Sequence, residues 1–218
     1  MLRLLPERAA FCAAENTLLV ADVHLGKAHS FRRLGVPVPE GTTAGTLARL
    51  TRAIEVTGAR HVVVLGDLLH AALATATSRG EATRQAVAAW RRAHPAVQLT
   101  LVRGNHDAKA GDPPADWEVA VVEEPWPLGP YALRHEPRPD EGGRYVLAGH
   151  LHPALHLSGR GPGRLRLPCF HFGASFGVLP AFGEFTGGVG VRAAPGDRLF
   201  AIAEDEVREV GALHCQAS

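Results

Sequence analysis

The sequence predicts an α/β fold in which a parallel sheet packs against a second sheet formed later in the chain. In the first half, short runs rich in Val and Leu alternate with segments of helical periodicity, which is typical of βαβ units. Each of these runs stops at a polar cluster, as buried strands do where they end in functional loops. After Pro153 the helical periodicity gives way to short strand-like runs separated by Gly and Pro. An α/β first part is therefore followed by an all-β second part.

The elements of the first part follow from these patterns. The predicted strands lie, in chain order, at residues 17–21, 61–65, 98–103, 131–134 and 145–148. Residues 43–57 place Leu47 and Ile54 on one face of a predicted helix, and residues 80–93 repeat the pattern around Trp90. Strand and helix thus alternate over the first three strands, which predicts a parallel sheet.

The second part contributes strands only. They are predicted at residues 164–171, 188–191, 199–203 and 207–210. We expect them to form a second sheet packed on the first, with residues 159–163 as a loop within the same domain.

Composition excludes several classes of protein. The 218 residues include 46% hydrophobic and 21% charged residues, which is ordinary for a globular chain and unlike a disordered one. A net charge of +1 argues against a protein that mainly coats nucleic acid or an anionic membrane, although a local basic groove stays possible. Three widely spaced cysteines indicate reduced thiols and a cytoplasmic protein. No signal peptide, membrane span or particular oligomeric state is predicted.

Polar clusters follow five of the predicted strands. They are Asp22-Val23-His24, Gly66-Asp67, Gly104-Asn105-His106-Asp107, a lone His135, and Gly149-His150-Leu151-His152. Ligands in α/β sheets bind at the carboxyl ends of strands, so we expect these clusters to converge. On extended backbone, Asp22 and His24 point to the same side while Val23 turns into the core. Gly66 lets the backbone approach a bound ion closely.

The residue types in these clusters favour transition metals. Two Asp, one Asn and at least four His supply oxygen and imidazole ligands without a thiolate, which suits Mn, Fe, Zn, Co or Ni rather than Ca or a structural zinc. Seven ligands are too many for one ion. They suit two divalent ions that share a bridging carboxylate and retain room for water.

The ordered motifs DxH, GD, GNH[D/E], a lone His and GHxH resemble those of the calcineurin-like binuclear metallophosphoesterase superfamily. The resemblance implies a four-layer αββα sandwich of two packed mixed sheets flanked by helices, in a single domain over residues 1–218. It also implies two ligand sets that share Asp67. The first metal is expected on Asp22, His24, Asp67 and His152, and the second on Asp67, Asn105, His135 and His150.

A closer resemblance is to the ligase-associated DNA damage response endonucleases, which are encoded beside a DNA ligase and a helicase. Residues 21–27, the pair Phe31-Arg32, Gly35 and residues 179–188 carry it. The resemblance implies a manganese-dependent phosphodiesterase that cleaves DNA, including single-stranded DNA, in DNA repair. It also implies a functional association with the ligase and the helicase.

Residue chemistry suggests a mechanism for such an enzyme. A hydroxide shared by the two metals is expected to attack phosphorus in line. His106 adjoins the ligand Asn105 and is predicted to be the general acid, with Asp107 orienting its imidazole. Asn105, His106, Lys27 and His70 are the predicted substrate contacts, although His70 could equally be a capping residue and Lys27 part of a solvated helix face.

Three arginines that follow the last motif could form a local basic groove, or could simply be solvated. They are Arg160, Arg164 and Arg166.

Two other functions compete with DNA cleavage. The same metals could hydrolyse a small substrate such as a cyclic nucleotide, a nucleotide-sugar pyrophosphate or a phosphomonoester, because metal motifs recognise the phosphate alone. The short loops favour an open site and a polymer. A non-catalytic scaffold is the other alternative, but such a protein should have lost ligands, and all seven are retained.

Overall fold

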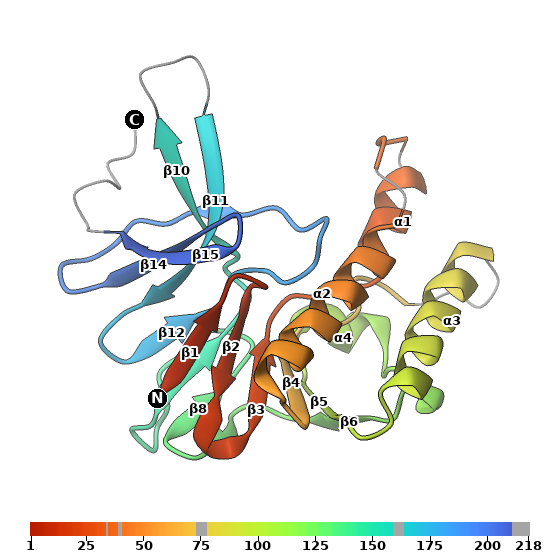
Figure 1. Ribbon diagram of the computed structural model, residues 1–218, viewed down its shortest axis with the longest axis horizontal. Coiled ribbons are helices and arrows are strands. Elements are labelled where there is room, and N and C mark those ends of the chain that lie inside the picture. Colours follow the sequence, from red (N-terminus) through yellow and green to blue (C-terminus); the bar gives the residue numbers. More distant parts are fainter. Residues whose placement is uncertain (34, 39–40, 73–77, 159–163, 211–218) are drawn as a thin grey trace.

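The computed structural model describes residues 1–33, 35–38, 41–72, 78–158 and 164–210 (Figure 1). The loop predicted at 159–163, including Arg160, lies outside the described residues. Two sheets pack face to face, and helices lie beside the first of them. Within the described residues, no helix is long and apolar enough to cross a membrane.

The first sheet has six strands in the order β1-β2-β3-β4-β5-β6. Their bounds are Leu2–Leu5 (β1), Ala9–Cys12 (β2), Thr17–Val20 (β3), His61–Leu65 (β4), Gln98–Val102 (β5) and Val119–Val122 (β6). The strands β3 to β6 are parallel, as predicted for the first three of the βαβ series. The strands β1 and β2 add an antiparallel edge that the sequence patterns did not predict.

The second sheet has nine strands, with the main order β13-β10-β11-β12-β9-β8-β7 and with β14 and β15 joined through β11. Their bounds are Trp126–Leu128 (β7), Tyr131–Leu133 (β8), Tyr145–Ala148 (β9), Pro153–Ser158 (β10), Arg164–Phe172 (β11), Phe176–Val178 (β12), Val189–Gly190 (β13), Arg198–Ala203 (β14) and Glu206–Val210 (β15). The predicted second sheet is confirmed. It also contains the two strands at 131–134 and 145–148.

The described helices all come before the second sheet. They are Lys27–Arg33 (α1), Thr42–Thr57 (α2), Ser78–Ala93 (α3) and Asn105–Ala110 (α4), with 3-10 turns at Ala13–Glu15 and Ala115–Trp117. Helix α2 ends at Gly58, whose φ of 67° permits its N–H to bond to the Ile54 carbonyl. The helices predicted at 43–57 and 80–93 are therefore confirmed.

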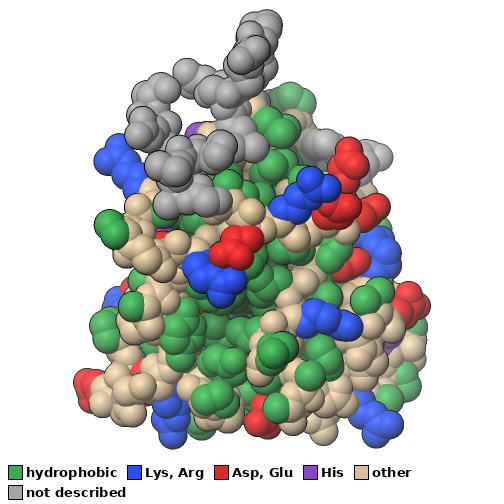
Figure 2. Space-filling model, turned by 60° about the vertical axis from the view of Figure 1, so that its left-hand side comes forward, with side chains coloured by type: hydrophobic (Ala, Val, Ile, Leu, Met, Phe, Trp, Pro, Cys, Tyr) green, Lys and Arg blue, Asp and Glu red, His purple; other side chains and the backbone are tan. Residues whose placement is uncertain are grey.

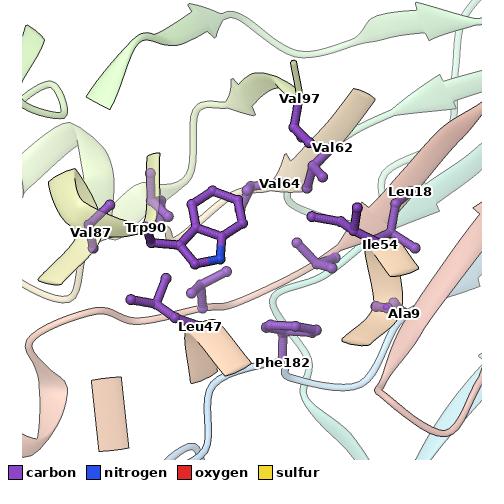
Figure 3. Close-up of a cluster of buried hydrophobic side chains, with 14 of the residues drawn as sticks. Ala9, Leu18, Leu47, Ile54, Val62, Val64, Val87, Trp90, Val97 and Phe182 are labelled. Atoms are coloured by element: carbon purple, nitrogen blue, oxygen red, sulfur yellow. The ribbon is translucent and has the colours of Figure 1, made fainter. Parts of the chain in front are cut away.

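Successive side chains along the strands of the first sheet point to opposite faces, which divides the core into two layers. In β3, Leu18 and Val20 pack toward the helices, whereas Leu19 packs toward the second sheet. The helix-side layer brings α2 and α3 against β4 around Trp90 (Figure 3). The indole N–H of Trp90 donates to Thr51 Oγ1 at 2.9 Å, so its polar atom is satisfied within the core. Burial on both faces explains the continuous apolar runs of these strands.

The predicted helical layer outside the second sheet is not found among the described residues, where no helix follows Trp117. The parallel strands β8 and β9 are joined by a segment with Pro137, Pro139 and the pair Gly142-Gly143, which disfavour a helix. Figure 2 shows hydrophobic side chains gathered over the middle of one face of the molecule. The two packed mixed sheets are thus confirmed, but helices cover the first sheet alone in the described part of the chain.

Candidate metal centre

The predicted polar clusters meet at the carboxyl ends of strands from both sheets. Those after β3, β4 and β5 come from the first sheet, whereas His135 and the 149–152 cluster follow β8 and β9 of the second. Hydrogen bonds fix the loops to one another. The Asp22 amide donates to the Gly66 carbonyl at 3.2 Å, and the His150 amide donates to Asp22 Oδ2 at 2.9 Å. The strands therefore hold the site rigid from two sides.

One group of side chains contains Asp22, His24 and His152, whose ligand atoms all lie within 4.8 Å of one another. Asp22 Oδ1 lies 3.2 Å from His152 Nε2, and His24 Nε2 lies 3.4 Å from the same nitrogen. Asp67 Oδ2 lies 3.8 Å from His24 Nε2. These four residues are the first predicted ligand set, and the structure brings all of them together.

A second group surrounds the other oxygen of Asp67. Asp67 Oδ1 lies 3.5 Å from His135 Nε2. That nitrogen lies 2.8 Å from Asn105 Oδ1 and 3.0 Å from His150 Nδ1. The second predicted ligand set is thus also brought together, with Asp67 between the two groups.

The chemistry of these atoms fits cations. The Leu65 carbonyl lies 3.2 Å from His135 Nδ1, so Nδ1 carries the ring proton and Nε2 presents a lone pair. That lone pair faces Asn105 Oδ1, which is also an acceptor. Asp22 Oδ1 is buried and accepts no hydrogen bond from the described residues. A divalent ion in each group would satisfy these facing lone pairs.

Burial keeps His24 in the form that binds metal. Burial lowers the pKa of His24 to about 2, and the positive charge of Lys27 adds to the decrease. The imidazole is therefore neutral at physiological pH, as ligation requires. Lys27 begins α1 beside this group. Burial lowers the Lys27 pKa as well, while the carboxylates of Asp22 and Asp67 oppose that decrease.

The backbone at the site is not extended, contrary to our expectation for the DxH motif. Asp22 and His24 have φ values of 53° and 49°, and Asp67, His150 and His152 have 54°, 68° and 47°. Such left-handed backbone costs about 1–3 kcal/mol at a residue other than Gly and is concentrated at functional sites. Val23 is nevertheless buried in the core, as predicted.

Position 66 requires a glycine because the His135 ring packs against the backbone there. A Cβ at this position would lie 2.1 Å from His135 Nδ1, and its φ is 74°. Any side chain here would displace the His135 ring.

His106 lies at the opening of the site. Its Nε2 is 4.0 Å from Asp67 Oδ2, and its side chain is 35% exposed. Its backbone amide donates to Asp67 Oδ1 at 2.9 Å. The His70 carbonyl oxygen lies 3.1 Å from His106 Nδ1, and the two rings stack with centroids 5.0 Å apart. His106 Nε2 therefore points toward the two groups of ligands.

Asp107 does not orient the His106 ring, which corrects our prediction. Its oxygens accept hydrogen bonds from the backbone amides of Asp67 (2.7 Å), Leu69 (2.9 Å) and Gly104 (3.0 Å). Burial raises the pKa of Asp107, and the bonds from Leu69 and Gly104 oppose the increase. The orienting acceptor is the carbonyl of His70, and a backbone carbonyl has no signature in a sequence.

We expect Asp107→Ala to destabilise the metal-free protein by about 3–5 kcal/mol, because three amide donors lose their acceptor in a buried place. Urea denaturation measures the loss. Asp107→Asn keeps one carbonyl oxygen and should lose less. A midpoint for Asp107→Ala equal to that of the wild type would contradict this role.

Sequence patterns missed Glu124, which follows β6. Its Oε2 accepts the His135 amide at 2.7 Å, and its Oε1 lies 3.8 Å from Arg134 Nη1. Glu124 thus fixes the backbone that carries His135. Of the three arginines considered for a groove, Arg164 begins β11 and Arg166 is exposed on it.

A family model and a similar crystal structure relate the chain to the phosphoesterases. The family model of the calcineurin-like phosphoesterases matches residues 16–118. The crystal structure of Pseudomonas putida nuclease MPE is similar to the chain at 45% identity and a TM-score of 0.81, covering 96% of this chain and 94% of that one. The alignment with the E. coli phosphoesterase YfcE covers 92% of this chain and 99% of the YfcE chain, at 14% identity and a TM-score of 0.41. The search of curated proteins gave no match.

Proposed function

The chain belongs to the calcineurin-like phosphoesterase family, and from this premise we propose that it is a two-metal phosphodiesterase that cleaves DNA strands. One observation carries the proposal. Seven oxygen and imidazole ligands form two groups around the two oxygens of Asp67.

In this proposal Asp22, His24, Asp67 and His152 hold one ion, and Asp67, Asn105, His135 and His150 hold the other. Two such ions, when bound, polarise phosphate oxygens and make water more acidic. Carboxylate and amide oxygens combined with imidazoles suit Mn²⁺, and they also accept Fe, Zn, Co or Ni.

His106 donates the proton that the leaving oxygen needs. In the imidazolium form, its Nδ1–H donates to the His70 carbonyl while its Nε2–H faces the substrate. Asp67 Oδ2 lies 4.0 Å from Nε2, so this nitrogen is close to both ligand groups. After transfer, the ring keeps the Nδ1 proton, so the same hydrogen bond holds the neutral product form. His70 positions His106 through its carbonyl, and Lys27 lies beside the first ligand group.

The DNA substrate is supported by the similarity to a nuclease over nearly the whole chain. Exposure of the site agrees with it. His150 is exposed, and Leu151 next to it is 46% exposed, so a bulky strand can reach the ligands from solvent. A role in DNA repair beside a DNA ligase and a helicase, and a cytoplasmic location, belong to the proposal through the sequence resemblance.

A substrate comparison tests this function. Protein stripped with EDTA is assayed with Mn²⁺, Zn²⁺ or Mg²⁺ on single-stranded circular DNA, duplex DNA, a cyclic nucleotide and bis-p-nitrophenyl phosphate. We expect Mn²⁺ to restore hydrolysis of bis-p-nitrophenyl phosphate and cleavage of the circle. An intact circle together with rapid hydrolysis of the cyclic nucleotide would instead indicate a small-substrate enzyme.

A further inference from the structure

A cavity of about 160 Å³ lies beside His152. Its walls come from the turn after β1, from β10 and β11, and from the segment before β13. Residues that line it include Arg8, Ala154, Arg166, Pro168 and Gly188. A cavity of about 150 Å³ accommodates a benzene-sized molecule, so this one has room for a phosphodiester group.

Two arginines give the cavity a positive character. Arg8 is half-buried, and its Nη1 donates to the Ala181 carbonyl at 3.4 Å. Burial lowers the pKa of Arg8 to about 10, and repulsion by Arg49 adds to the decrease. The guanidinium is still charged at neutral pH. Arg166 approaches from β11 and is exposed.

Neither guanidinium forms an ion pair with the residues that the structure describes. The described lining contains one carboxylate, Glu184, which is itself exposed. The charge of Glu184 acts on Arg8, but one exposed carboxylate faces two guanidinium groups, so an anion that enters the cavity would be stabilised by them. His152 on the same wall connects the cavity to the first ligand group.

A second, smaller cavity also borders that ligand group. It is lined by His24 and Lys27, and it shares Glu184 and Thr186 with the first cavity. Each cavity therefore contains one imidazole of the first ligand group and at least one cationic side chain. Cationic side chains in two cavities beside the ligand centre match a substrate that carries more than one phosphate.

We propose that the cavity beside His152 binds the phosphate that neighbours the scissile one in a DNA strand, through Arg8 and Arg166. The inference rests on the proposed function, since it assumes a strand at the ligand centre. Planar guanidinium groups match phosphate oxygens through paired N–H donors. Gly187 on the wall exposes backbone with nothing near its missing Cβ, so the strand can approach closely there. A substrate with a single phosphate leaves this subsite empty.

The test compares two substrates in the Mn²⁺-loaded protein. Arg8→Gln, Arg166→Gln and the double variant are assayed on a short single-stranded oligonucleotide and on bis-p-nitrophenyl phosphate. We expect kcat/KM for the oligonucleotide to fall about 10- to 100-fold in the double variant, as for a charge-assisted hydrogen bond. The rate with bis-p-nitrophenyl phosphate should stay unchanged. Arg8→Lys should restore part of the loss.

Salt dependence adds a second measurement. Loss of one phosphate contact should reduce the slope of log(kcat/KM) against log[NaCl] by about 0.7 for a single strand. The control is Arg198→Gln with Arg208→Gln, which removes the same charge from exposed positions on β14 and β15. This control should cleave the oligonucleotide like the wild type.

The outcomes separate the two claims. Wild type that hydrolyses bis-p-nitrophenyl phosphate but not DNA overturns the proposed substrate and this inference together. If wild type cleaves DNA and the double variant cleaves it equally well, the subsite is wrong and the function stands. Equal losses on both substrates would also overturn the subsite, because they would assign the arginines to the fold or to the centre itself.

Discussion

Asp67→Asn is expected to lose at least about a thousand-fold in kcat on DNA and on bis-p-nitrophenyl phosphate, or roughly 4 kcal/mol of transition-state stabilisation. In the native protein, the two carboxylate oxygens of Asp67 lie 3.8 Å from His24 Nε2 and 3.5 Å from His135 Nε2, so Asp67 belongs to both ligand groups. Asn has nearly the same shape but no charge, and its nitrogen cannot bind a metal. Both substrates should suffer equally, because both depend on the ions.

The control for this change is Asp197→Asn on the second sheet. Asp197 Oδ2 lies 2.7 Å from His171 Nε2 and accepts the Ala194 amide at 2.9 Å, so its role is to connect β11 with the loop before β14. We expect its kcat to equal that of the wild type. If Asp67→Asn also keeps wild-type activity, the bridging role is wrong.

His106→Gln is expected to separate the two substrates. Loss of a general acid costs about 10²–10⁴ in rate when the leaving group is an alkoxide, as in DNA. The p-nitrophenolate ion is stable at neutral pH and leaves without a proton, so hydrolysis of bis-p-nitrophenyl phosphate should fall only a few-fold. The His106 side chain is 35% exposed, and among the described residues its ring forms a hydrogen bond only with the His70 carbonyl, so the substitution should leave the fold intact.

His156→Gln serves as the control, because His156 is exposed on β10 and takes no part in the ligand groups. Its activity on both substrates should match the wild type. A His106→Gln variant that loses both activities equally would assign His106 to metal binding or substrate placement. One that cleaves DNA normally would remove it from the mechanism.

Much of the fold follows from local patterns. The runs at 17–21, 61–65 and 98–103 are mostly apolar because helices and a second sheet cover both faces of the first sheet. The helices at 43–57 and 80–93 show the apolar stripe of helices that pack on one side. The strands β1, β2 and β6 of the first sheet and β7, β10 and β12 of the second were missed. None of them leads into one of the polar clusters that marked β3, β4, β5, β8 and β9, and short strands carry little periodicity of their own.

The candidate site could be predicted because each ligand follows directly after a strand. The position of those strands in space could not be predicted. The strands β8 and β9 join the second sheet through pairing with strands distant in sequence, such as β12. The role of Asp107 was wrong for a related reason. Its three backbone partners, at Asp67, Leu69 and Gly104, meet only in the folded chain. The same holds for Arg8 and Arg166, which lie more than a hundred residues apart and line one cavity.

The most direct test of the account is a crystal structure of the protein loaded with Mn²⁺, with anomalous scattering measured to locate the ions. The account predicts two anomalous peaks, one contacting Asp22, His24 and His152 and the other Asn105, His135 and His150, with Asp67 contacting both. A single peak, or two peaks that do not share Asp67, would contradict it.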